Sequence, residues 1–171
     1  MTQDGPGINP TIDARVRIGH VHLKVADLER SLAFYRDILG FTVTRERAGA
    51  VFMSAGGYHH HLAINTWQSA GAEPPPPGCT GLYHVAILYP TRRLLADALQ
   101  RLIAARIPLD GASDHGVSEA LYLRDPDENG VELYRDRPQD EWEHAPNGHI
   151  VMGSKPLDLR NLLAELEQPA T

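Results

Sequence analysis

The sequence predicts an α+β fold built from two similar modules, each with the order strand, helix, strand, strand, strand (βαβββ). The strand pattern of His20-Val-His-Leu returns in the second half of the chain as His84-Val-Ala-Ile. In both places a helical pattern follows, and short strand patterns follow the helix. A proline-rich stretch, Pro74–Gly78, separates the two halves. Because each helix can cover only one face of its own sheet, we expect the uncovered faces of two mixed sheets to form a cleft.

The first module begins with alternating polar and apolar residues from Arg17 to Val25, the pattern of a half-buried strand. Asp27 can cap the helix that follows, and Gly40 can end it. The apolar face of this helix comprises Leu28, Leu32, Phe34, Tyr35, Ile38 and Leu39. Short strand patterns then occur near Phe41–Arg45, Ala50–Ala55 and His59–Thr66. These elements complete one βαβββ unit.

The second module repeats this order after the proline-rich stretch. Its first strand is predicted at His84–Leu88, its helix at Leu94–Ala105, and later strands near Ser118–Leu123 and Gly130–Tyr134. The turn Asp125-Pro-Asp-Glu-Asn-Gly130 joins the last two strands. Beyond the module, we expect a further strand at Ile150–Gly153 and a short helix at Leu159–Leu166, capped by Asp158.

These patterns give the following organisation. Residues 1–14 are expected to form a flexible arm, and residues 15–138 a single domain. Within that domain, the first module spans 15–70, the linker 71–80 and the second module 81–138. Residues 139–171 form a C-terminal extension with a strand and a helix.

The composition excludes several classes of function. Sixteen Lys and Arg against 22 Asp and Glu give a net charge of −6, which disfavours nucleic acid or an anionic membrane as the partner. No apolar run approaches the length of about 18 residues that a membrane span needs, and the N-terminus has no signal-peptide pattern. A single cysteine cannot form an internal disulfide. We therefore expect a cytoplasmic protein. Histidine is the one residue type with an unusual number, nine in 171 residues.

Alternation along the strands places several of these histidines on the uncovered face. Because Val21 and Leu23 should pack on the helix, His20 should point the other way. The same alternation puts three more residues on the inner faces, at equivalent places in the repeat: His61, His84 and Glu132. Two imidazoles and one carboxylate from separate strands can form a facial triad for a divalent metal such as Fe(II). Such a triad leaves coordination positions open for a substrate and O₂.

Two long stretches of the chain are similar to a known family. The residues from His20 to Phe41 resemble the opening of the vicinal oxygen chelate superfamily, and Asp125-Pro-Asp-Glu-Asn-Gly-Val-Glu-Leu133 resembles its closing signature. This superfamily includes glyoxalase I, fosfomycin resistance proteins, bleomycin-binding proteins and extradiol dioxygenases. The resemblance covers about residues 17–138 and implies paired βαβββ modules. Three stretches resemble the bacterial catechol 2,3-dioxygenase group in particular: Ser54–Trp67, Thr80–Leu88 and Gly111–Tyr122.

The resemblance implies a function and a metal site. The metal ligands would be His20, His84 and Glu132, binding Fe(II) or Mn(II). His61 holds the fourth equivalent place, where it is either a further ligand or lies just off the metal. The implied activity is that of a metal-dependent extradiol-type dioxygenase, which cleaves a catechol-like aromatic with O₂ in aromatic catabolism. Members of the family often form dimers, so a homodimer is one option for this chain.

The same comparison implies catalytic residues. Extradiol cleavage needs a base near the metal, because one hydroxyl of the substrate must lose its proton. The resemblance places this base at His60, whereas strand alternation turns His60 towards the helix. A bulge at His59–His61 would reconcile the two readings; otherwise His59 or His61 takes the role. His115 and Tyr122 match positions that the dioxygenases use near the oxygen or the substrate.

Two other functions remain open. A glyoxalase-type isomerase or lyase would use the same metal cleft without O₂, but the glutamate expected at the place of His61 is absent. A small-molecule-binding module of the bleomycin-resistance kind would bind its ligand in a dimer groove and would need no metal ligands. The presence of His20, His84 and Glu132 counts against this second alternative.

Overall fold

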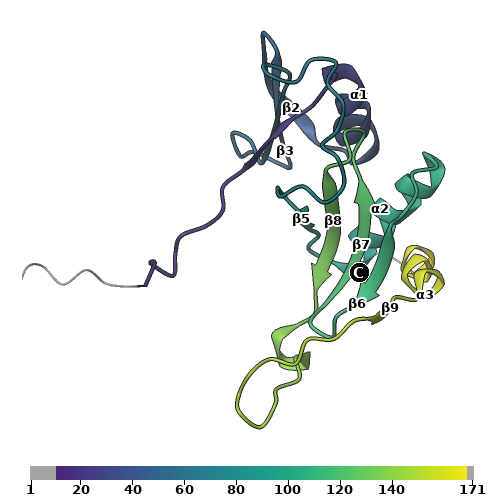
Figure 1. Ribbon diagram of the computed structural model, residues 1–171. Helices are drawn as coiled ribbons and strands as arrows, with labels where there is room; N and C mark the ends of the chain where they lie inside the picture. The colour runs from purple at the N-terminus through teal and green to yellow at the C-terminus, as the bar shows by residue number, and fades with distance from the viewer. Residues whose placement is uncertain (1–10, 169–171) are drawn as a thin grey trace, which may run out of the picture.

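The computed structural model describes residues 11–168, and these residues form two mixed β-sheets with helices packed on one face of each (Figure 1). This architecture confirms the predicted α+β class. Most of the arm expected at 1–14 lies outside the described residues, as do the last three residues of the C-terminal extension. One cluster of buried apolar side chains joins the two modules behind the sheets, and it includes Leu23, Tyr35, Leu99, Leu121 and Leu162.

The first sheet has the strand order β1-β4-β3-β2. Its strands are β1 (Val21–Lys24), β2 (Thr42–Arg47), β3 (Ala50–Ser54) and β4 (Leu62–Asn65). β1 pairs with β4 in parallel, and the other neighbours are antiparallel. The regular strands are shorter than the sequence pattern predicts, because β1 begins only after His20 and β4 only after His61. Both histidines therefore lie at strand ends.

The helix of the first module begins and ends as predicted. The carboxylate of Asp27 accepts a hydrogen bond from the backbone N–H of Arg30, and Gly40 has the positive φ of +87° that favours glycine after a helix. The helix is α1 (Leu28–Leu32) followed by a π-helical segment, η1 (Ala33–Ile38). This wider turn allows two consecutive aromatic residues, Phe34 and Tyr35, both to be buried.

The second sheet repeats the topology of the first, with one strand added. Its order is β5-β8-β7-β6-β9, with β5 and β8 parallel and the others antiparallel. The strands are β5 (Val85–Leu88), β6 (Gly111–Asp114), β7 (Ser118–Arg124), β8 (Gly130–Asp136) and β9 (Lys155–Pro156). The match between the orders 1-4-3-2 and 5-8-7-6 confirms the internal repeat.

The helices of the second module lie on one side of its sheet (Figure 1). They are α2 (Arg92–Ala104), capped by Thr91, and α3 (Leu159–Leu163), which continues into the short η3 (Ala164–Glu167). Asp158 caps α3 as predicted, accepting from two backbone N–H groups. The strand expected at Ile150–Gly153 is wrong: Ile150 makes one isolated bridge to His144, after the short helix η2 (Gln139–Glu141). The pairing that the extension makes with β6 comes later, through β9.

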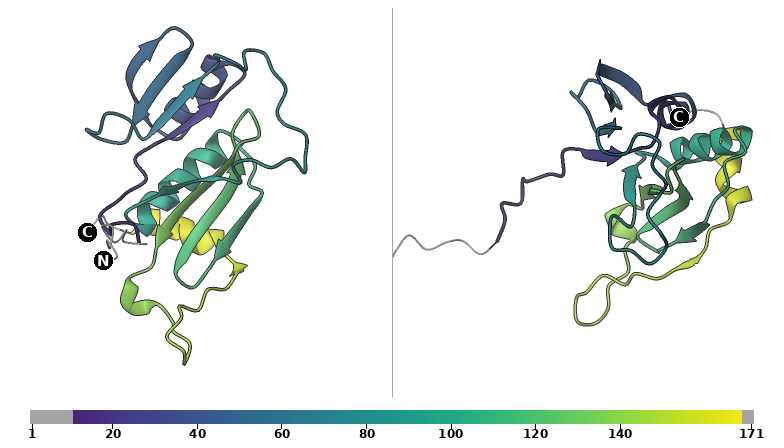
Figure 2. Two further views of the ribbon diagram at one scale, coloured as in Figure 1. Left: turned by 60° about the vertical axis from the view of Figure 1, so that its left-hand side comes forward. Right: turned by 45° about the horizontal axis from the view of Figure 1, so that its top comes forward.

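The turn between β7 and β8 fastens the two modules together. It reaches the helix of the first module (Figure 2), where the hydroxyl of Tyr35 donates to Asp125 Oδ2 over 2.9 Å. Asp127 accepts from the Ala26 N–H at 3.0 Å and from the side chains of Arg30 and Ser31. Both carboxylates are almost fully buried. We call this set the inter-module clasp: Ala26, Arg30, Ser31, Tyr35, Asp125 and Asp127.

Candidate metal and substrate site

The second sheet brings two predicted metal ligands together on its uncovered face. His84 directly precedes β5, and Glu132 lies in the neighbouring strand β8. Val131 and Leu133 are buried on the helix side, so Glu132 points to the opposite face, as alternation predicts. His84 Nε2 lies 2.9 Å from Glu132 Oε2. The Nδ1 atom of His84 is buried and has no hydrogen-bond partner among residues 11–168.

Two further predicted residues join this pair. Tyr122 stands directly opposite Glu132 in the β7–β8 register, and its hydroxyl donates to Glu132 Oε1 over 3.0 Å. His115 Nε2 lies 2.8 Å from the same hydroxyl. His84, His115 and Tyr122 line a cavity of about 420 Å³, and Glu132 contacts two of them. We call them the polar cluster: His84, His115, Tyr122 and Glu132.

The polar cluster is anchored to the C-terminal extension through His115. His115 Nδ1 lies 2.7 Å from the carbonyl oxygen of Gly153, in the C-terminal extension. Since a carbonyl can only accept, Nδ1 is the donor in this bond, which turns Nε2 towards Tyr122. Burial and the charge of Glu132 raise the pKa of Tyr122 to about 12. The phenol therefore stays protonated at neutral pH and can act as a donor.

The first sheet carries the other predicted residues on its uncovered face. His20 directly precedes β1, the same position that His84 holds before β5. Its ring packs on His60, with ring centroids 4.4 Å apart, and His60 in turn meets Phe52 edge-on at 5.2 Å. Desolvation and the neighbouring His20 and His59 lower the pKa of His60, which favours its neutral form.

The alternation argument for His60 is wrong. Because β4 begins at Leu62, residues 59–61 belong to the preceding bend, and strand alternation does not apply to them. His60 consequently lies beside His20 on the uncovered face, where the family resemblance puts it. His59 stays close by, with its Nδ1 2.7 Å from His60 Nδ1.

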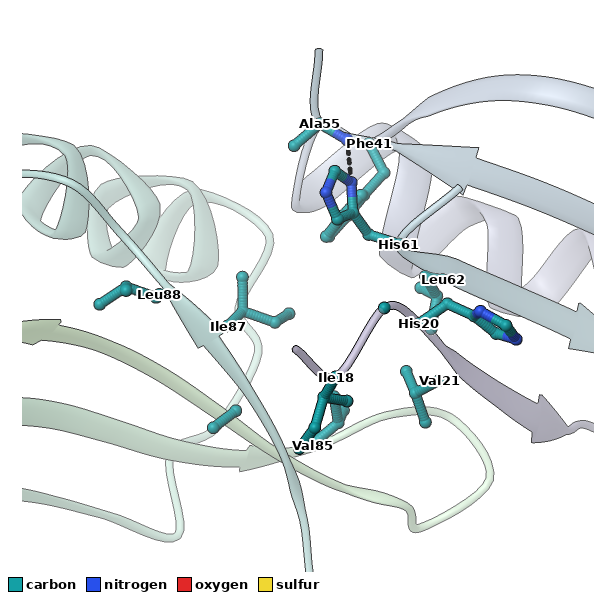
Figure 3. A pocket seen from close by; sticks show the side chains of 12 residues that line it. Ile18, His20, Val21, Phe41, Ala55, His61, Leu62, Val85, Ile87 and Leu88 are labelled. Atoms are coloured by element: carbon teal, nitrogen blue, oxygen red, sulfur yellow. Dashed lines mark hydrogen bonds between the residues drawn. The ribbon is translucent and has the colours of Figure 1, made fainter. Parts of the chain in front are cut away.

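His61 is directed elsewhere. Its Nδ1 lies 3.0 Å from Ser54 Oγ and accepts from the Ala55 N–H at 3.3 Å. The ring borders a cavity of about 440 Å³ between the modules, which is lined mainly by apolar side chains. Figure 3 shows the rings of His61 and His20 pointing in different directions. Bonding to Ser54 and Ala55 thus separates His61 from the other candidate ligands.

The four residues predicted at repeat-equivalent places do not converge within one copy of the chain. The prediction that His61 is equivalent to Glu132 is wrong, because the strand register puts Glu132 opposite Tyr122 and Ala63 opposite Phe52, so that Ala63 holds the equivalent place. His84 and Glu132 meet, but His20 belongs to the other module and borders a different cavity. Across residues 11–168, no group of three or more His, Cys, Asp or Glu side chains is placed to hold a metal ion. Alternation predicts which face of a sheet a residue occupies, but not which two faces oppose each other. The metal-ligand roles of His20 and His61 therefore stay predictions.

Phe52, Asn65 and Trp67 were not singled out from the sequence, whereas His22 was expected on the same face as His20. His22 meets the rings of Phe52 and Trp67 at 6.0 and 5.5 Å, and its Nε2 lies 2.9 Å from Asn65 Nδ2. Partial burial and the charges of His20 and Arg47 lower the pKa of His22. The alternation of His20, His22 and Phe52 with buried residues on their strands could have placed all three on this face. We call this surface the aromatic wall: His22, Phe52, His60 and Trp67.

Comparison with known proteins identifies the family to which this chain belongs. The chain belongs to the Glyoxalase/Bleomycin resistance protein/Dioxygenase superfamily, whose family model matches residues 17–133. It is 42% identical over 155 residues to Catechol-2,3-dioxygenase of Bacillus subtilis (strain 168), an alignment that covers 91% of this chain and 54% of that protein. It is 34% identical over 124 residues to Biphenyl-2,3-diol 1,2-dioxygenase 3 of Rhodococcus globerulus, covering 70% and 63%. The matched part thus spans only about half to two thirds of these relatives.

Solved structures support the same fold. The lactoylglutathione lyase of Agrobacterium tumefaciens superimposes with a TM-score of 0.56 at 26% identity, covering 72% of this chain and 96% of that one. A glyoxalase/dioxygenase from Nostoc punctiforme gives 0.60 at 19% identity, covering 77% and 100%. These matches confirm the fold that the sequence predicts. Among residues 11–168, none of the helices has the length and apolar character needed to cross a membrane.

Proposed function

We propose that this chain is a metal-dependent extradiol-type dioxygenase, which cleaves a catechol-like aromatic with O₂. The observation that carries the proposal is the polar cluster, in which an imidazole and a carboxylate lie 2.9 Å apart beside a protonated phenol. The names of two relatives, a catechol and a biphenyl-diol dioxygenase, support the same substrate chemistry of adjacent hydroxyls.

The donor atoms of the polar cluster fit a divalent ion. His84 Nε2 and Glu132 Oε2 would hold it, and imidazole with carboxylate is a set that suits Fe(II) or Mn(II). When bound, the metal would favour loss of a proton from the diol and provide the redox centre for O₂. Tyr122 gives its single hydroxyl proton to Glu132 in this structure, and with Glu132 turned to the metal that proton would be donated to a substrate oxygen instead. The ring of His115 borders the same hydroxyl.

His20 would be the third ligand and would come from a second copy of the chain. Within one copy it lies on the other module, so the site needs a neighbouring first module. We call His20 and the polar cluster the two half-sites. Large apolar residues near both are exposed to solvent: Ile18, two residues before His20, is 98% exposed, and Tyr83, next to His84, is 81% exposed. In a symmetric pair, each copy would give His20 to one site and receive it in the other.

His60 would act as the base in this arrangement. Its ring packs on His20, so it would lie next to the substrate hydroxyl that loses its proton. One ring nitrogen, Nδ1, is engaged with His59, which leaves Nε2 to accept that proton. The proton would then leave through the row of histidines at the edge of the first sheet.

A glyoxalase-type isomerase or lyase is the second candidate function. The specific observation in its favour is the structural match at 26% identity to the lactoylglutathione lyase of Agrobacterium tumefaciens. Against it, Ala63 holds the place equivalent to Glu132, where a carboxylate is expected, and the neighbouring His61 is bonded through Nδ1 to Ser54 and Ala55.

The first experiment measures metal content and O₂ uptake after anaerobic purification. Chain reloaded with Fe(II) or Mn(II) should consume O₂ in equal amount with a catechol and form a yellow ring-opened product. If no catechol drives O₂ uptake while a hemithioacetal is isomerised, the glyoxalase-type alternative is correct.

A mixing experiment tests the shared site. His20→Ala and Glu132→Ala chains should each be inactive, but a mixed dimer would contain one complete site and one doubly defective site. Unfolding and refolding the two variants together should restore roughly a quarter of the native activity. A site contained within one copy would give no recovery, and the two variants refolded separately provide the control.

A further inference from the structure

Arg47 lies on the uncovered face of the first sheet, against the aromatic wall. It is the last residue of β2, and its guanidinium carbon lies 5.0 Å from the ring centre of Trp67 and 5.4 Å from that of Phe52. Both distances are within the range of cation–π attraction. The rings therefore hold the planar group against the face of the sheet instead of leaving it extended in water.

The local structure fixes the ring on which Arg47 lies. The indole N–H of Trp67 donates to the Ala48 carbonyl over 3.1 Å, in the β2–β3 turn. Gly49 in this turn has φ +72°, and a Cβ there would lie 2.9 Å from Trp67 Cδ1, so a side chain would push the indole away. The buried side chain of Asn65 accepts from the Trp67 backbone N–H and contacts His22. Hydrogen bonds and packing thus hold the rings of the aromatic wall in place.

The positive charge of Arg47 has no acidic partner. Within residues 11–168, no carboxylate lies within ion-pair distance of it, whereas Arg92, Arg135 and Arg137 all pair with the buried Glu119. Ring contacts occupy the flat faces of a guanidinium and leave its N–H edges free to donate. Two N–H groups along one edge of the guanidinium match the two oxygens of a carboxylate, which can accept two parallel hydrogen bonds.

The position of Arg47 relative to His20 defines what could reach it. A chain of ring contacts runs from His20 to His60 at 4.4 Å, from His60 to Phe52 at 5.2 Å, and from Phe52 to Arg47 at 5.4 Å. A flat aromatic ligand laid along this wall, with its hydroxyls at the His20 end, would direct its opposite end towards Arg47. A substituent at that end would meet the guanidinium.

We propose that Arg47 selects substrates that carry a carboxylate, so that the substrate class is aromatic acids with adjacent hydroxyls. The diol half of this statement rests on the proposed function. The anion half rests only on Arg47, the rings that hold it and the absence of a carboxylate beside it. Charge complementarity on a preformed wall is what distinguishes such an acid from the corresponding neutral aromatic.

Binding without metal tests the anion half alone. A Trp142→Phe background leaves Trp67 as the one tryptophan of the two in the chain, so its fluorescence reports occupancy of the wall. The matched ligands are 3-phenylpropionate and 3-phenyl-1-propanol, which have no diol. We expect the acid to bind roughly 10-fold tighter than the alcohol, as for a charge-assisted hydrogen bond in partial contact with water. Arg47→Met should remove this preference, and Arg47→Lys should keep part of it.

The control variant changes the same charge elsewhere. Arg36→Met removes one positive charge from the helix of the same module, where Arg36 pairs with Asp37, and should leave the preference unchanged. An equal effect of Arg36→Met and Arg47→Met would reduce the preference to long-range electrostatics and overturn the proposal. Equal binding of the acid and the alcohol by the native chain would overturn it as well.

Turnover by the metal-loaded chain separates this proposal from the proposed function. The pair is 3-(3,4-dihydroxyphenyl)propionate and 4-ethylcatechol, compared by kcat/KM. Arg47→Met should raise KM for the acid roughly 10-fold more than it raises KM for 4-ethylcatechol. If both catechols are cleaved with no dependence on Arg47, the dioxygenase stands and the anion site fails. If neither is cleaved but the binding preference depends on Arg47, the dioxygenase fails and the anion site stands.

Discussion

The two modules have the same strand order but differ in the chemistry of their uncovered faces. At one equivalent pair of positions, Tyr122 of the second module donates through its hydroxyl to Glu132, whereas Phe52 of the first contacts His60 and Arg47 through its ring. At another pair, Glu132 meets His84, whereas Ala63, its equivalent in the register of the first sheet, has no donor side chain. The repeat thus provides two scaffolds, one carrying the polar cluster and the other the aromatic wall.

In the proposed function, the second module would bind the metal and the first would bind the aromatic ring. A metal centre needs charged donors held close together, and the second sheet provides them in adjacent strands. An aromatic ring needs flat apolar contacts, and the first sheet provides those. His20 is the exception, because it lies on the aromatic side yet occupies the position equivalent to His84. Variants at equivalent positions can test whether this division holds.

The largest effect should come from Glu132→Ala. Removing the carboxylate leaves the polar cluster without its anionic donor, so the metal content should fall from about one per chain to near zero. O₂ uptake with a catechol should be lost with it. Elemental analysis after dialysis measures the first effect, and an oxygen electrode the second. Glu46→Ala, which removes an exposed carboxylate from β2, is the control; full metal retention in Glu132→Ala would contradict the site.

The His60→Ala and His61→Ala variants should differ in turnover, and this difference tests the roles of two neighbouring residues of the first module. His60→Ala should keep its metal but lose on the order of 10²–10⁴-fold in turnover, as expected for a lost general base. His61→Ala should keep both metal and most of its turnover, because Ser54 and Ala55 hold that ring away from His20. Metal loss in His61→Ala would instead make His61 a fourth ligand.

Exchanging the aromatic residues at the equivalent positions tests the hydroxyl. Tyr122→Phe gives the second module the residue that the first already has, and it removes one donor beside the metal. Turnover should fall by on the order of 10²-fold with the metal retained. Phe52→Tyr, the reverse exchange, should change turnover far less, because the ring contacts persist. Similar losses in both variants would show that packing of the ring, rather than its hydroxyl, matters at these positions.

Much of the fold could be predicted from local signals in the sequence. The repeat, the caps at Asp27 and Asp158 and the burial of Val131 and Leu133 all follow from spacing within one element. The orientation of His60 could not be predicted, because it depends on where β4 begins, and backbone pairing decides that. Strand β9 was missed for a similar reason: it is two residues long, and only its pairing with β6 defines it.

The candidate site was predicted less completely than the fold. Alternation placed His84 and Glu132 on one face, and the structure brings them into contact. It could not show that His20 lines a different cavity from His84, because contacts between residues distant in sequence decide how the two sheets are placed. The inter-module clasp is such a contact, and its residues read in the sequence as an ordinary turn and an ordinary helix. The arrangement of the half-sites therefore depends on packing that no local pattern records.

The smallest expected effect concerns this clasp and is one of stability. Tyr35→Phe removes the buried hydrogen bond from the phenol to Asp125 Oδ2. A bond to a charged group is typically worth about 1.5–3 kcal/mol, but Oδ2 also accepts from the Asn129 side chain at 2.9 Å, and Oδ1 accepts from two backbone N–H groups. The carboxylate would stay partly satisfied, so we expect the free energy of unfolding to fall by about 1–2 kcal/mol.

Urea unfolding of the metal-free chain measures this loss, with Tyr83→Phe as the control because Tyr83 is exposed. If the two variants lose the same small amount, the hydrogen bond does not stabilise the fold. If Tyr35→Phe also changes the slope of the transition, the modules unfold separately, and the clasp is what makes them cooperative. In that case the positions of the two half-sites depend on one phenol that lies outside both of them.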